Sequence, residues 1–123
     1  MDVMIFLDDE RDLHDVTWVD YRKYWGYYIL TFRTTKDAID FIQSHELDWH
    51  QTVFSLDHDL QEFDGTEEYT GYTFVKWLVD YLIENEIDLQ QLDVIAHTKN
   101  PIGKDNIEKY VKNAKEFYLR TPQ

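Results

Sequence analysis

Four short apolar runs, separated by longer amphipathic segments, limit how this chain can fold more than any other feature. The runs lie at residues 3–7, 27–32, 52–56 and 92–96 and have the length and composition of strands. The first run is continuously apolar, which is typical of a strand buried on both faces. Strands that alternate with helices favour a parallel sheet with right-handed crossovers. We therefore predict a single three-layer α/β domain over residues 1–123, with helices on both faces of a mostly parallel four-stranded sheet.

The segments between the runs are predicted to form helices and one loop. The expected helices are a short one within residues 12–26, one after Thr34, one over residues 74–82 and one that begins at Pro101. The helix over residues 74–82 is the clearest, because its apolar residues recur every three or four positions. Asn100 can cap the last helix, and proline is tolerated at a first helical position. A polar loop is expected over residues 60–70.

Polar side chains follow three of the apolar runs at the point where each run ends. They are Asp8, Asp9 and Glu10 after the first run, Asp57, His58 and Asp59 after the third, and His97 and Thr98 after the fourth. In parallel sheets, ligands bind at the carboxyl ends of the strands. We therefore expect these side chains to converge on one edge of the sheet.

Carboxylates gathered in this way predict a divalent cation site. Asp8, Asp9, Asp57 and Asp59 are the expected ligands of Mg²⁺ or Mn²⁺. An alternative for the first acids is a helix N-terminus, where negative charge is favourable. The histidines leave three roles open, because His58 and His97 could each serve as a transition-metal ligand, as a general acid or base, or as a hydrogen-bonded structural residue.

A cation beside carboxylates also suits phosphate chemistry. The Thr98 hydroxyl and the ammonium group of Lys99 or Lys104 are suitable partners for phosphate oxygens. The N-terminus of the last helix would add backbone donors. The alternatives are capping for Thr98 and ordinary solvation for each lysine.

Composition excludes several classes of function. The net charge is −13, from 25 acidic and 12 basic residues, which argues against a broad basic face for nucleic acid. The acidity fits either solubility together with a metal site, or docking on a basic protein partner. Without cysteine there is neither a disulfide nor a catalytic thiolate, as is common in the cytoplasm. The sequence shows neither a signal peptide nor an apolar run long enough to span a membrane.

Four segments resemble response-regulator receiver domains. Residues 4–10 resemble their first strand and Mg²⁺-binding acidic pair, residues 53–57 the strand that ends at the phosphorylated aspartate, residues 71–78 the third helix, and residues 94–98 the strand that ends at a hydroxyl residue. The resemblance implies a receiver/flavodoxin-like fold with strand order 2-1-3-4. It also implies that Asp57 accepts phosphate, that Asp8 and Asp9 hold Mg²⁺, and that Thr98 contacts the phosphoryl oxygens. Asp59 falls where the family uses a backbone carbonyl for the same ion.

The sequence departs from the receiver pattern after the fourth strand. Receivers have a fifth strand with a lysine at its end, whereas this chain passes from Thr98 into one helix, so Lys99 or Lys104 would have to substitute. The chain resembles more closely the short receiver-like proteins of bacteria and phages. That resemblance implies a fold truncated after the fourth βα unit, with His58, His97 and Asn100 in the site.

Three functions follow as hypotheses. The first is a receiver-like module that binds a divalent metal and phosphate, with Asp57 as phosphoacceptor, for signalling or docking. The second is a non-catalytic acidic protein that binds another protein. If a phage encodes it, that partner would be a protein of the host. The third is a metal-dependent phosphoesterase that uses His58 and His97. Expected partners are a protein or a small phosphorylated ligand, and neither nucleic acid nor a membrane.

Overall fold

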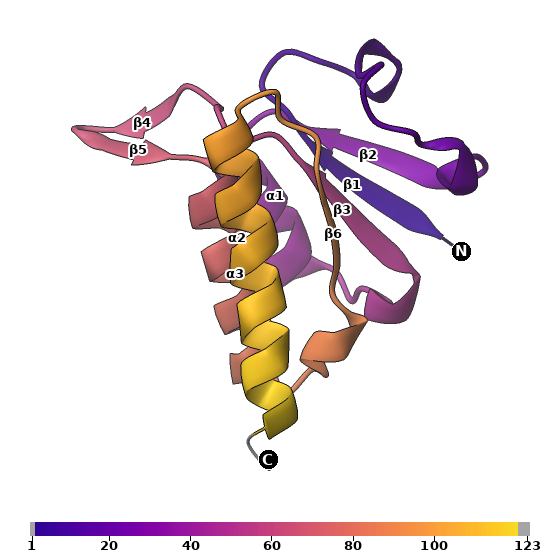
Figure 1. Cartoon of the computed structure of the whole chain (residues 1–123), viewed down its shortest axis with the longest axis vertical. Coiled ribbons are helices and arrows are strands. Elements are labelled where there is room, and N and C mark those ends of the chain that lie inside the picture. The colour runs from indigo at the N-terminus through magenta and orange to yellow at the C-terminus, as the bar shows by residue number, and fades with distance from the viewer. Residues whose placement is uncertain (1, 121–123) are drawn as a thin grey trace.

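A sheet of four parallel strands lies at the centre of the molecule, whose computed structural model describes residues 2–120. The strands are β1 (Val3–Leu7), β2 (Tyr28–Phe32), β3 (Thr52–Leu56) and β6 (Asp93–Ala96). Their order in the sheet is β2-β1-β3-β6 (Figure 1). The predicted class and order are confirmed, because β6 is the fourth strand of this sheet and the two strands numbered before it belong to a separate hairpin.

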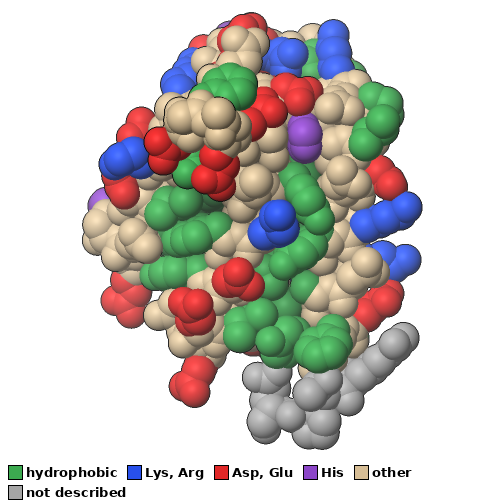
Figure 2. All heavy atoms as spheres, turned by 90° about the vertical axis from the view of Figure 1, so that its left-hand side faces the viewer, with side chains coloured by type: hydrophobic (Ala, Val, Ile, Leu, Met, Phe, Trp, Pro, Cys, Tyr) green, Lys and Arg blue, Asp and Glu red, His purple; other side chains and the backbone are tan. Residues whose placement is uncertain are grey.

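All three α-helices pack on one face of the sheet. They are α1 (Thr35–Ser44), α2 (Gly71–Glu84) and α3 (Pro101–Arg120). Ile5 and Leu7 of β1, together with Phe54 of β3, contribute to the core under these helices. Neighbouring residues of a strand point to opposite faces, so this core takes alternate residues of each strand. Figure 2 shows the helix side of the surface, where acidic side chains lie between hydrophobic patches.

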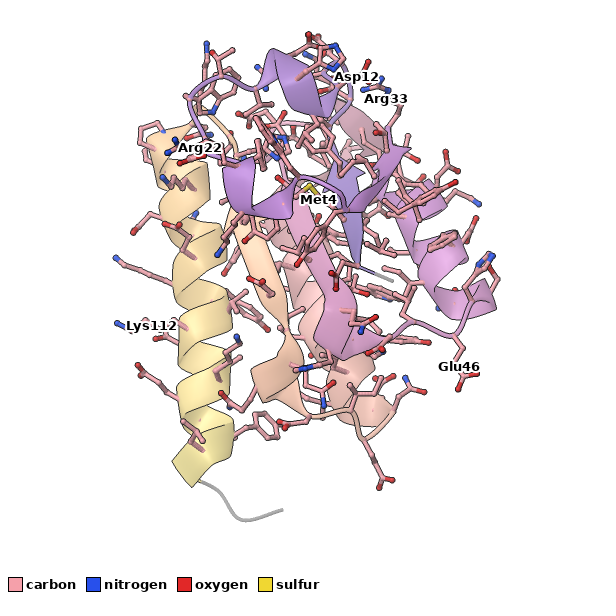
Figure 3. All side chains as sticks on the ribbon, turned by 90° about the vertical axis from the view of Figure 1, so that its right-hand side faces the viewer. Met4, Asp12, Arg22, Arg33, Glu46 and Lys112 are labelled. Carbon is pink, nitrogen blue, oxygen red and sulfur yellow. The ribbon has the colours of Figure 1, made fainter. Side chains whose placement is uncertain are left out.

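The other face is covered by residues 12–27, which cross the sheet near Met4 (Figure 3). The prediction of a single short helix here is wrong, because the segment contains two 3₁₀ helices, Leu13–Asp15 and Arg22–Tyr24. The layer is helical, as expected, but it holds no α-helix. The segment lacks the repeated apolar stripe that stabilises an α-helix against a sheet.

The aromatic residues of this segment divide into two groups. Tyr21 and Tyr24 are buried against the sheet and belong to its core. Trp18 and Trp25 are 37% and 78% exposed, so they contribute aromatic surface.

The predicted loop over residues 60–70 is instead an antiparallel hairpin of β4 (Glu62–Asp64) and β5 (Glu67–Tyr69). Gly65 in its turn has a φ of +64°, which favours glycine. The Glu62 carboxylate accepts hydrogen bonds from the backbone N–H and the hydroxyl of Thr35, at 2.7 and 2.8 Å. The hairpin is thus fastened to the start of α1.

A side chain caps the start of α1 and, as predicted, Asn100 caps the start of α3. The Thr34 hydroxyl oxygen accepts a hydrogen bond from the backbone N–H of Asp37 at the start of α1. The side-chain oxygen of Asn100 accepts hydrogen bonds from the backbone N–H groups of Ile102 and Gly103, at 3.1 and 3.0 Å. Two further 3₁₀ helices, Trp49–Gln51 and Leu89–Gln91, precede β3 and β6. Within residues 2–120, every helix is too short or too polar to cross a membrane.

Substituting Gly103 by alanine is expected to destabilise the protein. An added Cβ would lie 2.7 Å from Cβ and Cδ2 of His58, so the ring would have to move. Elsewhere in a helix, glycine to alanine stabilises by about 1 kcal/mol. Here we expect a loss of about 1–3 kcal/mol, the usual range for overpacking. Urea unfolding measures the change, and Asn106→Ala at an exposed position of α3 is the control. A more stable Gly103→Ala protein would show that the His58 ring does not rest on α3.

Candidate functional site

Three buried polar side chains meet at the carboxyl ends of three adjacent strands. Leu7 pairs with Leu56, and Leu56 pairs with Ala96. The next residue of each strand is therefore aligned as well, and these residues are Asp8, Asp57 and His97. Their exposed fractions are 0%, 5% and 0%, and their potential ligand atoms all lie within 4.8 Å of one another. The structure thus brings together the three strand ends that the sequence singled out.

The Asp8 carboxylate is held by several donors. Its Oδ1 accepts backbone N–H groups from Glu10 and Arg11, at 3.0 and 2.9 Å. Its Oδ2 lies 3.0 Å from Nε2 of His97. Burial raises the pKa of Asp8, but these hydrogen bonds outweigh it and leave the pKa below its usual value. Asp8 is therefore a fixed, charged carboxylate at neutral pH.

His97 belongs to a buried chain of hydrogen bonds. Its Nδ1 lies 2.8 Å from the Ser55 hydroxyl, which lies 2.8 Å from the Tyr21 hydroxyl. Burial lowers the pKa of His97 and raises that of Tyr21 to about 12, so the ring is neutral and the phenol keeps its proton.

One assignment of protons gives every donor in this chain an acceptor. A charged Asp8 only accepts, so Nε2 of His97 carries the proton and donates it. Nδ1 then accepts from Ser55, whose oxygen accepts from Tyr21. In this arrangement His97 orients Asp8, and both of its ring nitrogens are engaged.

The charged form of Asp57 is less favourable than that of Asp8. Its Oδ1 accepts the backbone N–H of His58 at 2.9 Å, and Thr98 hydrogen-bonds to it as well. Burial, followed by the negative charge of Asp8, raises the pKa of Asp57. Nη1 of Arg11 lies 3.6 Å from Oδ2 of Asp57 and 3.3 Å from Oδ2 of Asp8. The guanidinium thus stands where two negative charges need a counterion.

Above these residues is a small cleft of about 160 Å³. It is lined by Asp9, Glu10, Arg11, Asp57, Asp59, Gln61, Thr98, Lys99 and Asn100. Two of the expected metal ligands, Asp9 and Asp59, therefore line the cleft but lie outside the group of three described above. Burial, with the charge of Glu10, raises the pKa of Asp9. Acidic groups outnumber cations on the cleft wall.

The other predicted site residues lie around the cleft. Nδ1 of His58 lies 2.9 Å from Oδ1 of Asp59, and its ring rests on Gly103 rather than lining the cleft. Nδ2 of Asn100 donates to Asp59 at 3.3 Å, while its oxygen caps α3. Lys104 is exposed on α3 and does not line the cleft. Their roles in binding or catalysis stay predictions.

Four residues that the sequence did not place in the site support it. Ser55 and Tyr21 continue the hydrogen-bond chain from His97, as described above. Arg33 donates to the backbone carbonyls of Asp8 and Arg11, at 3.3 and 2.6 Å, and lies beside Asp12 (Figure 3). Nε1 of Trp18 donates to the carbonyl oxygen of His97 at 2.7 Å. Ser55, one of two polar residues in the run 52–56, was the one signal available in the sequence.

Replacing Asp57 by asparagine is expected to stabilise the protein in the absence of divalent ions. The folded pKa of Asp57 lies above the value of 3.8 for an unperturbed aspartate, so its charged form opposes folding at neutral pH. Asparagine keeps an acceptor for the His58 N–H and removes the charge. We expect Tm in a chelating buffer to rise by a few degrees, the shift that about 1 kcal/mol produces. The control is Asp64→Asn on the exposed hairpin. A lower Tm for Asp57→Asn would contradict this assignment of charge.

Comparison with known proteins identifies the family. The family model described as "Cyclic-phosphate processing Receiver domain" matches residues 3–113. No curated protein matches the chain. One similar solved structure is the signal receiver domain of a protein assigned as a Luxo repressor from Vibrio parahaemolyticus. The two share 17% identity over 100% of both chains, with a TM-score of 0.42.

A second similar structure is the response regulator LqsR of Legionella pneumophila. It has 16% identity and a TM-score of 0.39, and the match covers 97% of this chain and 48% of that one. At such TM-scores, neither likeness adds to the description of the fold or the site. The family model, in contrast, spans the sheet, the cleft and most of α3, and on that match the chain belongs to the cyclic-phosphate processing receiver domains.

Proposed function

We propose that the cleft binds the phosphate group of a cyclic phosphate ester together with a divalent cation and hydrolyses the ring to a phosphomonoester. The observation that carries this proposal is the pair of buried carboxylates, Asp8 and Asp57, under a cleft that also presents Arg11 and Lys99. The description of the family supports the choice of substrate class.

The residues fit a hard divalent cation. Asp8 and Asp57 offer carboxylate oxygens, the ligands that Mg²⁺ and Mn²⁺ prefer, and Asp9 and Asp59 stand nearby in the cleft. Burial and the negative charge of Asp8 raise the pKa of Asp57, which supports a site where added positive charge is favourable. A bound cation would neutralise these carboxylates and polarise the phosphoryl oxygens. His97 supports Asp8 from behind and is not needed as a ligand.

The side chains of the cleft would have separate roles in binding the phosphate group and in hydrolysis. Arg11 and Lys99 would bind the phosphoryl oxygens. The Thr98 hydroxyl, which lies beside Asp57, would bind these oxygens as well. In this proposal Asp57 would also accept a proton from water as the water adds to phosphorus. One ester P–O bond of the ring would then break, and the leaving oxygen would take up the proton that Asp57 accepted. The product contains all the atoms of the ester and of one water molecule.

A substrate panel followed by ³¹P NMR tests this function. The panel holds nucleoside 2′,3′- and 3′,5′-cyclic phosphates, each with Mg²⁺, Mn²⁺ or a chelator. We expect a phosphomonoester signal from at least one cyclic phosphate, dependent on the cation and at least 100-fold slower in Asp8→Asn and Asp57→Asn. His58→Ala separates the roles of the histidines, because a ring that rests on α3 should be dispensable for catalysis. Lack of turnover of every cyclic phosphate with either cation would refute hydrolysis.

Phosphorylation of Asp57 is the second candidate function. Asp57 lines the cleft at the end of β3 and is hydrogen-bonded by Thr98, which is the arrangement that the receiver resemblance implies. Incubation with acetyl phosphate and Mg²⁺, followed by measurement of intact mass, tests it. A phosphoryl adduct that Asp57→Asn loses would support a signalling module. If the protein binds neither cation nor phosphate, the acidic interaction protein is the function that remains.

A further inference from the structure

We propose that Trp18 is a positioning residue whose indole ring holds the two cations of the cleft, Arg11 and Lys99, ready for phosphate. The inference rests on the proposed function only in naming phosphate as the group that the cations meet. The positioning itself can be tested without a ligand.

The indole is fixed in place by the strand that bears His97. Its Nε1 donates a 2.7 Å hydrogen bond to the carbonyl oxygen of His97, at the end of β6. This bond joins the segment of residues 12–27 to the edge of the sheet where the site lies. Trp18 is 37% exposed, so part of the ring stays at the surface beside the cleft.

Both cations lie close to this ring. Nζ of Lys99 is 4.3 Å from a ring centroid of Trp18, and Cζ of Arg11 is 5.1 Å from it. Both distances fall within the roughly 6 Å over which a cation is attracted to an aromatic face. Lys99 and Arg11 come from different strand ends, so a single side chain links two walls of the cleft.

The indole keeps the Lys99 ammonium group apart from the acidic side chains of the cleft. Asp9, Glu10, Asp57 and Asp59 line the same cleft as the two cations, and a flexible ammonium group would be drawn onto one of these carboxylates. Within residues 2–120, Lys99 nevertheless takes part in no ion pair. Its charge rests on a neutral ring and is therefore available to an incoming anion. Of the two cations, Lys99 is the one that a phosphate can engage without breaking an existing salt bridge.

The test compares two variants of Trp18 by NMR without ligand. The ring currents of the indole should move the ε-methylene protons of Lys99 away from their values in an unfolded chain. Trp18→Leu should abolish this shift, and Trp18→Phe should retain part of it. Trp25→Leu, at an exposed position of the same segment, is the control and should leave the shift unchanged. A Lys99 methylene signal at unfolded-chain values in the unmodified protein would overturn the proposal.

Calorimetry then links this position to binding. Mg²⁺ alone is titrated first, and inorganic phosphate is titrated at saturating Mg²⁺. In Trp18→Leu we expect phosphate affinity to fall about 3- to 10-fold, the range given by a cation–π contribution at a partly exposed site. Mg²⁺ affinity should stay within about twofold, because the carboxylates remain, and Trp18→Phe should restore most of the phosphate affinity.

The outcomes separate the two proposals. Phosphate binding that is equal in Trp18→Leu and the unmodified protein would overturn the role of Trp18 and leave the proposed function intact. An unmodified protein that binds no phosphate would contradict the proposed function, and the NMR shift alone would then decide whether Trp18 holds the cations. Equal loss of phosphate and Mg²⁺ affinity in both variants would indicate a merely structural tryptophan and would also overturn the inference.

Discussion

Replacing Arg11 by glutamine should tighten the binding of Mg²⁺ or Mn²⁺ and weaken the binding of phosphate. Nη1 of Arg11 lies 3.3 Å from an oxygen of Asp8 and 3.6 Å from one of Asp57, so the guanidinium serves as the counterion of both. Glutamine would leave the two negative charges to attract a metal ion. We expect the metal dissociation constant to fall roughly tenfold, which corresponds to about 1.4 kcal/mol.

Phosphate should respond in the opposite direction, because it loses a donor with a planar fork that matches its oxygens. At saturating Mg²⁺ we expect affinity for inorganic phosphate to fall by roughly tenfold, again about 1.4 kcal/mol. Calorimetric titration of each ligand measures both changes. Arg22→Gln is the matched control, because Arg22 is exposed and pairs with Asp20. Weaker metal binding by Arg11→Gln would show that the guanidinium and the metal do not compete.

Replacing His97 by alanine should destabilise the protein strongly. The ring is fully buried, stacks on Phe6 with a centroid distance of 4.5 Å, and hydrogen-bonds to both Asp8 and Ser55. Alanine would leave a cavity and remove a partner from the buried Asp8 carboxylate. We expect a loss of about 3–5 kcal/mol, the range for truncating a large buried aromatic side chain to alanine. Urea unfolding measures it, with His50→Ala at an exposed position as control. A loss below about 1 kcal/mol would contradict the hydrogen-bond chain described here.

The same histidine predicts how stability depends on pH. Burial lowers the folded pKa of His97 below its usual value of 6.5, so the unfolded chain binds a proton first as the pH falls. Stability should therefore decrease from about pH 6.5 down to the folded pKa of His97. The lowered pKa of Asp8 acts in the same direction only below its usual value of 3.8. The raised pKa of Asp57 acts in the opposite direction, because its protonation favours folding.

Melting temperatures between pH 7.5 and 5 test this pH dependence. Asp57→Asn provides the reference, because it removes the opposing group and should make the decrease steeper. A Tm that rises on acidification of Asp57→Asn would show that His97 is not neutral in the folded protein.

The sequence predicts the sheet well because buried parallel strands carry a strong local signal. Residues 3–7 and 52–56 are mostly apolar runs that polar residues follow, and both are strands with those bounds. The hairpin over residues 62–69 was missed because it is polar and very short. Its position depends on the contact of Glu62 with Thr35, far away in the sequence.

The sequence predicts which strand ends meet at the site, but it does not predict the contacts that their side chains make. Strand ends determine that Asp8, Asp57 and His97 meet, and simple topology gives that result. Side-chain partners depend on the path of residues 12–27, which brings Trp18 and Tyr21 to the sheet, and local sequence patterns do not specify that path. The direction of His58 is a similar case, because its ring turns toward Gly103 through packing against α3.

The paired register of β1, β3 and β6 also limits how this cleft could evolve or be redesigned. Adjacent strands stay about 4.8 Å apart whatever side chains they carry, so the floor of the cleft has a nearly invariant width. Preference among ligands must then reside in the surrounding loops, chiefly around Gln61 and Lys99. Varying the loops around Gln61 and Lys99, while keeping the residues at the strand ends, is therefore the most direct way to alter ligand selectivity.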